Sequence, residues 1–229
     1  MSYCNIAIDG PSGAGKSTIA RILAQRFGMT YVDTGAIYRA IALYMHNLGI
    51  DCSDASAVIA HLPEIEVSIE YGEEGQRVLL CGEDVSKEIR RHEISECTSQ
   101  VSVIPQVRQF LMELQRGLAK TRDCIMDGRD IGTVVLPQAN LKIFLTASPE
   151  DRAQRRHAEL VQKGSTISFD QVLADLLQRD ERDSNRAVAP LRPAKDSVIV
   201  NTSGNTLEKS VEQLEELIVN TLGISPNCP

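Results

Sequence analysis

Short apolar runs alternate with amphipathic segments along most of the chain. Five of these runs are predicted to be buried strands, at residues 3–9, 29–33, 123–127, 141–147 and 197–202. The segments between them show helical spacing and are predicted to form helices at residues 18–27 and 36–47 and from points near Pro105, Pro149, Ser168 and Thr206. Strands that are apolar on both faces are typical of a parallel sheet covered by helices. The pattern therefore predicts an α/β fold, a five-stranded parallel sheet with helices on both faces, whose ligand lies at the carboxyl ends of the strands.

One stretch departs from this alternation. From about residue 62 to 100, apolar positions recur every second residue, as at Val67 and Ile69, and a Gly-Glu-Glu-Gly turn follows them. We expect a small antiparallel insert here, within a single domain that spans residues 1–229. A polar stretch at about residues 161–167 joins two predicted helices, and we interpret it as part of a short lid at about residues 152–167; the alternative is an exposed connection.

Composition limits the classes of partner. The chain has 229 residues, 42% of them hydrophobic, which is enough to bury a sizeable core. Its 24 basic and 31 acidic residues give a net charge of -7, which argues against broad attraction to nucleic acid or to an anionic membrane. The sequence contains no apolar run of membrane-spanning length and no signal-peptide pattern. We expect a cytoplasmic monomer without nucleic-acid or membrane partners, in which local cations bind any anionic ligand.

Six cysteines and four histidines are scattered along the sequence. They form neither a CxxC pair nor a Cys/His cluster, so their spacing indicates neither a zinc site nor a disulfide framework. We expect the cysteines to be reduced, ordinary side chains, and we assign the histidines no role in the chemistry.

The clearest chemical motif is a glycine-rich loop at residues 10–17, between the first predicted strand and the first predicted helix. Its sequence, Gly-Pro-Ser-Gly-Ala-Gly-Lys-Ser, satisfies the GxxxxGK[ST] pattern. Glycines let the backbone wrap a phosphate, while NH groups and the helix N-terminus supply positive potential. We predict that ATP or GTP binds here, at Gly10, Pro11, Ser12, Gly13, Ala14, Gly15, Lys16, Ser17 and Thr18.

Phosphoryl transfer asks a protein for placement and charge neutralisation more than for covalent chemistry. Lys16 is predicted to be a point charge for the β and γ phosphates, and the Ser17 hydroxyl a direct ligand of Mg²⁺. Asp127, at the end of the third predicted strand, is expected to bind Mg²⁺ through water; the alternative is an ordinary turn acid before Gly128.

Three arginines, Arg152, Arg155 and Arg156, share one face of the helix that begins the predicted lid. We expect this face to close on the triphosphate, with Arg155 taken as the catalytic member. A solvated basic face is the alternative interpretation.

Five motifs occur in a fixed order, and together they resemble one known family. They are Gly10 to Thr18, Asp33-Thr-Gly-Ala-Ile-Tyr-Arg39, Ser99-Gln-Val with Arg108, Asp127-Gly-Arg-Asp-Ile-Gly-Thr133, and Arg179-Asp-Glu-Arg-Asp-Ser-Asn-Arg186-Ala-Val-Ala-Pro190. In that order they resemble the bacterial cytidylate kinases, which make CDP from CMP, and the resemblance runs from Asn5 to about Leu217. It implies a P-loop NTPase fold, ATP with Mg²⁺, CMP or dCMP as the acceptor, and a monophosphate-binding role for the insert.

The resemblance also implies the residues that contact the acceptor, namely Thr34, Arg39, Ser99, Arg108, Arg129, Asp130, Arg179, Asp183 and Arg186. The first group, Arg39, Arg129 and Arg186, would surround the acceptor phosphate, and Arg39 and Arg129 would also assist catalysis. Guanidinium groups suit this role because they donate two parallel hydrogen bonds. The second pair, Arg179 and Asp183, would reach the ribose.

The third group, Ser99, Arg108 and Asp130, is implied to read the base. Cytosine presents an exocyclic amine beside two acceptors, so Asp130 would accept from the amine while Arg108 donates. Uracil would place a carbonyl oxygen against the Asp130 carboxylate, and we therefore expect weaker use of UMP.

Two alternatives stay open on the sequence. One is a kinase for another small acceptor, such as a sugar acid or shikimate. The other is a nucleotide-binding switch that hydrolyses slowly and signals through partners, although the sequence has no guanine-reading Asn-Lys-x-Asp run.

Overall fold

The computed structural model describes residues 3–72, 75–91, 93–162 and 164–227. They belong to two compact units: the first unit comprises residues 1–31 and 122–229, and the second unit comprises residues 32–121. Glu73 and Glu74 of the predicted turn, residue 163 of the predicted lid and Cys228 lie outside the described residues.

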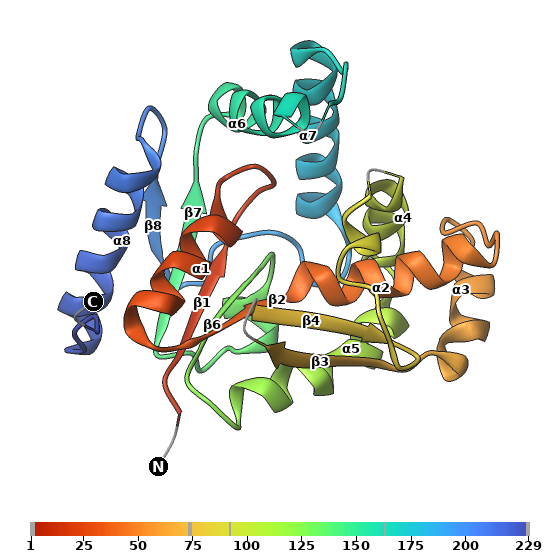
Figure 1. Ribbon diagram of the computed structural model, residues 1–229, viewed down its shortest axis with the longest axis horizontal. Helices are drawn as coiled ribbons and strands as arrows, with labels where there is room; N and C mark the ends of the chain where they lie inside the picture. The colour runs from red at the N-terminus through yellow and green to blue at the C-terminus, as the bar shows by residue number, and fades with distance from the viewer. Residues whose placement is uncertain (1–2, 73–74, 92, 163, 228–229) are drawn as a thin grey trace. The chain divides into compact units, whose positions relative to one another are not determined.

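A five-stranded sheet confirms the predicted fold class (Figure 1). Its strands are β1 (Asn5–Asp9), β2 (Thr30–Asp33), β6 (Cys124–Gly128), β7 (Leu141–Thr146) and β8 (Val198–Asn201), in the order β2-β6-β1-β7-β8. Strand β1 pairs in parallel with β6 and β7, and β7 pairs in parallel with β8. Because β1 is central, the residues that follow it emerge at the carboxyl edge between two neighbours, where α/β folds bind ligands.

The helices of the first unit are α1 (Lys16–Phe27), α6 (Pro149–Gln162), α7 (Phe169–Asn185) and α8 (Leu207–Leu222), with the short η3 (Ile131–Val135). Ser168 and Thr206 cap the N-termini of α7 and α8 through their hydroxyls, as the sequence predicts for helix starts. Apolar stripes of α1 and α8 pack against β1 and β7 and against each other. Burial of this kind stabilises the unit by about 2 kcal/mol for each large aliphatic side chain.

The second unit contains α2 (Thr34–Asn47), α3 (Ala55–His61), α4 (Ile94–Val101) and α5 (Pro105–Ala119), with short 3-10 turns at Leu62–Glu64 and Glu88–Arg90. Its antiparallel sheet is β3 (Val67–Gly72), β4 (Gly75–Leu80) and β5 (Glu83–Asp84), which confirms the antiparallel pattern expected within residues 62–100. Sequence periodicity did not predict α3 or α4. Helix α4 carries Thr98 and Ser99, which are poor helix formers, and it is held by packing on α2 through Ile94, Cys97 and Val101.

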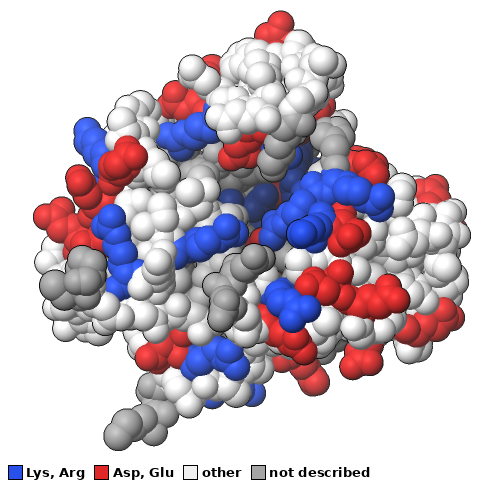
Figure 2. Space-filling view, in the orientation of Figure 1, with Lys and Arg blue, Asp and Glu red and all other residues white. Residues whose placement is uncertain are grey.

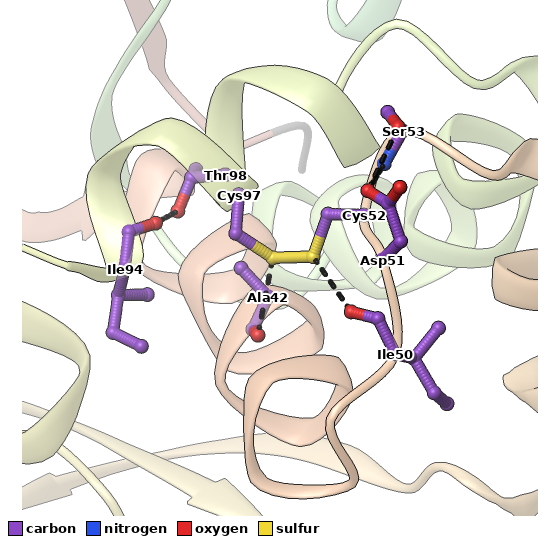
Figure 3. The surroundings of a disulfide bond; sticks show 8 residues. All are labelled: Ala42, Ile50, Asp51, Cys52, Ser53, Ile94, Cys97 and Thr98. Atoms are coloured by element: carbon purple, nitrogen blue, oxygen red, sulfur yellow. Dashed lines mark hydrogen bonds between the residues drawn. A yellow bond between two sulfur atoms is a disulfide. The ribbon is translucent and has the colours of Figure 1, made fainter.

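A disulfide joins Cys52, in the loop after α2, to Cys97 of α4 (Figure 3). Their Cα atoms are 5.2 Å apart although 45 positions separate them in the sequence. The expectation that all cysteines are reduced is wrong for this pair, because spacing along the chain does not reveal which residues folding brings together. Cys4, Cys81 and Cys124 carry free thiols.

No helix within the described ranges is long and apolar enough to cross a bilayer.

Candidate active site

The glycine-rich loop (residues 10–17) follows β1 and opens into α1, which begins at Lys16. Gly10 has a φ of +147°, and a Cβ there would lie 2.0 Å from the carbonyl oxygen of Leu145 in β7. Gly13 has a φ of +75°, and a Cβ there would lie 3.1 Å from Arg152 at the start of α6. Only glycine fits two such close approaches, so the neighbouring strand and helix determine the path of this loop.

Lys16 is the first residue of α1, and only 5% of its surface is exposed. Its Nζ donates a hydrogen bond to the carbonyl oxygen of Pro11 at 2.7 Å. Burial lowers the pKa of Lys16 to about 7; the charge of Arg129 acts in the same direction, while Asp127 and Asp9 oppose it. A buried ammonium with a lowered pKa is stabilised by an anionic ligand, and a phosphate group supplies that charge.

Two hydroxyl groups and a carboxylate lie together beside the glycine-rich loop. The Ser17 hydroxyl donates to Asp127 at 2.7 Å, and the Tyr31 hydroxyl donates to the other carboxylate oxygen at 3.0 Å. Hydroxyl and carboxylate oxygens are the ligands that Mg²⁺ prefers, so this pair fits the predicted metal. In the part of the chain that the structure describes, no group of three or more His, Cys, Asp or Glu side chains could hold a metal ion alone. A Mg²⁺ ion here would therefore take further ligands from phosphate and water.

The three arginines of α6 have different partners. Arg152 is buried and donates to the carbonyl oxygens of Ala147 and Ser12, at 3.1 and 3.0 Å. Arg155 donates to the hydroxyl and carbonyl oxygens of Thr202, at 3.2 and 2.7 Å. Its guanidinium also lies 4.0 Å from the place that a Cβ on Gly15 would take.

The third of these arginines, Arg156, pairs with exposed Glu159 at 3.0 Å. Two of the three side chains thus contact or approach the glycine-rich loop, and the third lies at the surface.

Predicted acceptor contacts in the first unit form ion pairs that share Asp183 and Arg186. Arg129 donates to Asp183 at 2.9 Å, and Arg186 donates to Asp130 at 3.1 Å. Burial acts to raise the pKa of Asp183, but the charges of Arg129, Arg179 and Arg186 outweigh it and hold that pKa below its usual value. The ion pairs link the segment after β6 to the end of α7, so residues from two of the sequence motifs lie in one place.

Asp9 is a functional candidate that sequence reasoning missed. Its two carboxylate oxygens accept hydrogen bonds from the backbone N–H groups of Ile131 and Gly132, each at 2.7 Å. A Cβ on Gly132 would lie 3.3 Å from Asp9 and 3.2 Å from Lys142, which explains a glycine in this motif. Burial raises the pKa of Asp9 to about 6, and the two backbone hydrogen bonds oppose that shift. The sequence feature that could have revealed Asp9 is an acidic residue at the end of an apolar strand, directly before the glycine-rich loop.

The other predicted contacts, Thr34, Arg39, Ser99 and Arg108, lie in the second unit. Arg39 of α2 donates to the carbonyl oxygen of Ile89 at 2.9 Å and to the hydroxyl of Ser95 at 3.0 Å.

Arg108 and Ser99 are connected through Ser102. Arg108 donates to the Ser102 carbonyl oxygen at 3.1 Å, and the Ser102 hydroxyl donates to the Ser99 carbonyl oxygen at 3.0 Å. The guanidinium of Arg108 also lies over the Tyr38 ring, 5.6 Å from its centroid. Thr34, Ser99 and Arg108 are all buried, so their polar groups are held in fixed environments.

Charge on the face shown in Figure 2 is mixed, with Lys and Arg side chains lying among Asp and Glu side chains. Positive potential for an anion therefore comes from individual, locally placed cations such as Lys16 and Arg129.

Comparison with known proteins identifies the family. The profile of the family described as "Cytidylate kinase" matches residues 6–220. The Cytidylate kinase of Carboxydothermus hydrogenoformans is 47% identical over 213 residues, which is 93% of this chain and 96% of the relative. That of Corynebacterium glutamicum is 50% identical over 214 residues, 93% of each chain. A solved structure of an uncharacterized protein from Eubacterium ventriosum shares the fold, with a TM-score of 0.53 at 10% identity, and the match covers 96% of this chain and 99% of that one. The chain belongs to the cytidylate kinase family.

Proposed function

We propose that this chain transfers the γ-phosphoryl group of ATP to CMP or dCMP, giving ADP and CDP or dCDP. The observation that carries the proposal is the hydrogen bond from the Ser17 hydroxyl to Asp127 at 2.7 Å, because it joins the glycine-rich loop to the motif that contains Arg129 and Asp130. Burial lowers the pKa of Lys16 in that loop, and the charge of Arg129 adds to the shift. Phosphate groups from two nucleotides would neutralise both cations.

An oxygen of the acceptor phosphate attacks the γ-phosphorus of ATP, and the bond from that phosphorus to the β–γ bridging oxygen breaks, so that ADP leaves. The acceptor oxygen is already anionic at neutral pH, so neither a protein nucleophile nor a strong general base is required. Catalysis then rests on alignment and charge. Lys16 neutralises the donor phosphates, while Arg39, Arg129 and Arg186 are the proposed contacts of the acceptor phosphate.

Mg²⁺, when bound with ATP, supplies further neutralisation of phosphate charge. Ser17 would ligate it directly and Asp127 through water, as their hydroxyl and carboxylate chemistry allows. Arg155, beside Gly15, is the lid arginine best placed to add positive charge near the donor phosphates. Closure of the lid, about residues 152–167, would exclude water from the transfer.

The remaining motif residues select the acceptor through its base and its ribose. Asp130 accepts from the cytosine amine, Arg108 and Ser99 complete the base contacts, and Arg179 and Asp183 bind the ribose.

Thr34, at the start of α2, is a further proposed contact of the acceptor. The insert at residues 62–100 is the proposed monophosphate-binding subdomain of a single-domain, monomeric, cytoplasmic enzyme without nucleic-acid or membrane partners.

A coupled assay of ADP formation tests the function, with CMP, dCMP, UMP, AMP, shikimate or no acceptor added. We expect rapid ADP release with CMP and dCMP, slower release with UMP, and only background without an acceptor. Lys16→Ala should lower kcat by at least about 100-fold, the effect of removing one group that stabilises transition-state charge. Equal rates with and without CMP would support a slowly hydrolysing switch instead, and a preference for shikimate would support a different kinase.

A further inference from the structure

Asp180 of α7 contacts the glycine-rich loop and α6 at the same time. One carboxylate oxygen accepts a hydrogen bond from the backbone N–H of Ser12 at 3.3 Å. The other accepts from the guanidinium of Arg152 in an ion pair. The two side chains are largely buried, with 18% of Asp180 and 5% of Arg152 exposed. A buried ion pair with good hydrogen bonding restrains the elements that carry it.

These contacts form a closed ring. The guanidinium nitrogen of Arg152 that pairs with Asp180 also donates to the carbonyl oxygen of Ser12 at 3.0 Å. Both backbone polar groups of Ser12 are therefore bound by side chains, one from α6 and one from α7. The next glycine packs directly on Arg152, because a Cβ on Gly13 would lie 3.1 Å from it. The start of the glycine-rich loop is thus connected to two helices.

The same helix faces the acceptor residues. Asp183, three positions after Asp180 and hence on the same face of α7, binds Arg129 at 2.9 Å. The charge of Asp180 also acts on Arg129 and contributes to raising its pKa. Arg179, the neighbour of Asp180, is the other proposed ribose contact. A movement of α7 in response to the acceptor would therefore act on the glycine-rich loop through Asp180.

We propose that Asp180 is a positioning residue that makes the binding of the two nucleotides interdependent, because it connects the glycine-rich loop to the helix that carries the ribose contacts. This inference rests on the proposed function. Acceptor binding to α7 would hold Asp180 and Arg152 in place, and the loop would then bind ATP with less loss of freedom. Since linkage is reciprocal, ATP would tighten acceptor binding by the same factor.

Binding measurements separate this role from a merely structural one. Calorimetric titration gives the Kd of CMP alone and the Kd of CMP with a saturating non-hydrolysable ATP analogue and Mg²⁺. We expect the analogue to tighten CMP binding by about 10-fold in the unchanged protein, a typical coupling factor. In Asp180→Asn, which keeps the volume and an acceptor for Ser12 but removes the negative charge, the factor should fall below about 2-fold while each nucleotide alone still binds.

Two further variants complete the design. Arg152→Lys keeps the positive charge but loses the Nε donor and the fork geometry, and we expect the same loss of coupling, so the test does not depend on one variant folding. Asp175→Asn is the matched control, because Asp175 lies on α7 but is exposed and bonds only Gln171 at 2.7 Å in the described contacts. It should keep the full coupling factor.

The outcomes decide separately on the two proposals. The role of Asp180 would be overturned if both Asp180→Asn and Arg152→Lys kept the full factor by which the ATP analogue tightens CMP binding. It would also be overturned if the analogue did not tighten CMP binding in the unchanged protein, even if that protein makes CDP. A lower thermal stability of Asp180→Asn with an unchanged coupling factor would reveal a structural role only. Failure of the unchanged protein to bind CMP at all would overturn the proposed function, and this inference with it.

Discussion

The Nε atom of Arg129 lies 2.9 Å from the Oδ2 atom of Asp183, and this ion pair joins the segment after β6 to the end of α7. Both side chains come from motifs for which the family resemblance implies contact with the acceptor. The pair is mostly buried, with 19% of Arg129 and 6% of Asp183 exposed, so each charge depends on the other.

Asp183 should make stability depend on pH in the acid range. Its folded-state pKa is held below the ordinary 3.8, so its contribution is fully present above that value and is lost as pH falls through the folded pKa. Asp183→Asn should cost about 3 kcal/mol of unfolding free energy at pH 7, and the difference from the unchanged protein should shrink below about pH 3.8. Urea unfolding at several pH values measures this difference, and a difference independent of pH would contradict the assignment.

Asp130 should set the choice between cytosine and uracil. Asp130→Asn retains the size of the side chain but replaces one acceptor with a donor, so the amine of CMP loses its partner. We expect kcat/KM for CMP to fall by about 100-fold and the ratio of CMP to UMP use to narrow.

Steady-state kinetics with both acceptors measures the effect, and Asp175→Asn on the exposed face of α7 is a suitable control. Since Arg186 donates to Asp130 at 3.1 Å, the stability of the variant should be measured as well. If kcat/KM fell by the same factor with CMP and with UMP, Asp130 would only hold Arg186 in place.

Gly10 should tolerate no side chain. Gly10→Ala would place a Cβ 2.0 Å from the Leu145 carbonyl oxygen and would also be strained at φ +147°. Gly204→Ala is the matched control, because Gly204 has a φ of +67° with nothing within 4 Å of a Cβ.

We expect Gly204→Ala to lower the free energy of unfolding by about 1 kcal/mol, from backbone strain alone, and Gly10→Ala to lower it several times more, as measured by urea unfolding. If the two variants lost the same free energy of unfolding, β7 would not constrain the loop.

The Cys52–Cys97 disulfide should stabilise the protein. A cross-link between positions 45 residues apart removes freedom from the unfolded chain, worth about 4 kcal/mol in the chain-entropy account. Reduction, or replacement of both cysteines by serine, should therefore lower the unfolding free energy by about 2–4 kcal/mol.

Titration of thiols in denaturant, before and after reduction, should reveal two additional thiols. An unchanged number of thiols would show that the pair is a dithiol, which is the usual state in a reducing compartment.

Much of the fold was predictable because buried parallel strands give apolar runs and helices give amphipathic stripes. The start of α7 illustrates this, since Ser168 precedes the stripe and caps the helix. Helix α4 was missed because its polar, poorly helix-forming residues are held in place by tertiary packing. The disulfide was missed for a related reason, since contact between distant residues is not encoded in their spacing.

The sequence predicted that Ser17 and Asp127 share one metal site, and the structure brings their oxygens to 2.7 Å from each other. That the glycine-rich loop binds ATP and that this pair binds Mg²⁺ stay predictions. Shared helical spacing could not tell that Arg152 is buried against Ser12 whereas Arg156 pairs with Glu159 at the surface. Asp9 and Asp180 escaped attention because their partners are backbone groups and arginines that lie far away in the sequence.

Transfer of labelled phosphate tests the central claim most directly. The chain is incubated with Mg²⁺, CMP and ATP labelled at the γ-phosphate, and the products are separated by chromatography. The account predicts that the label appears in CDP in amounts equal to the ADP formed, and that Lys16→Ala gives almost none. Label found in inorganic phosphate, with no labelled CDP, would contradict it.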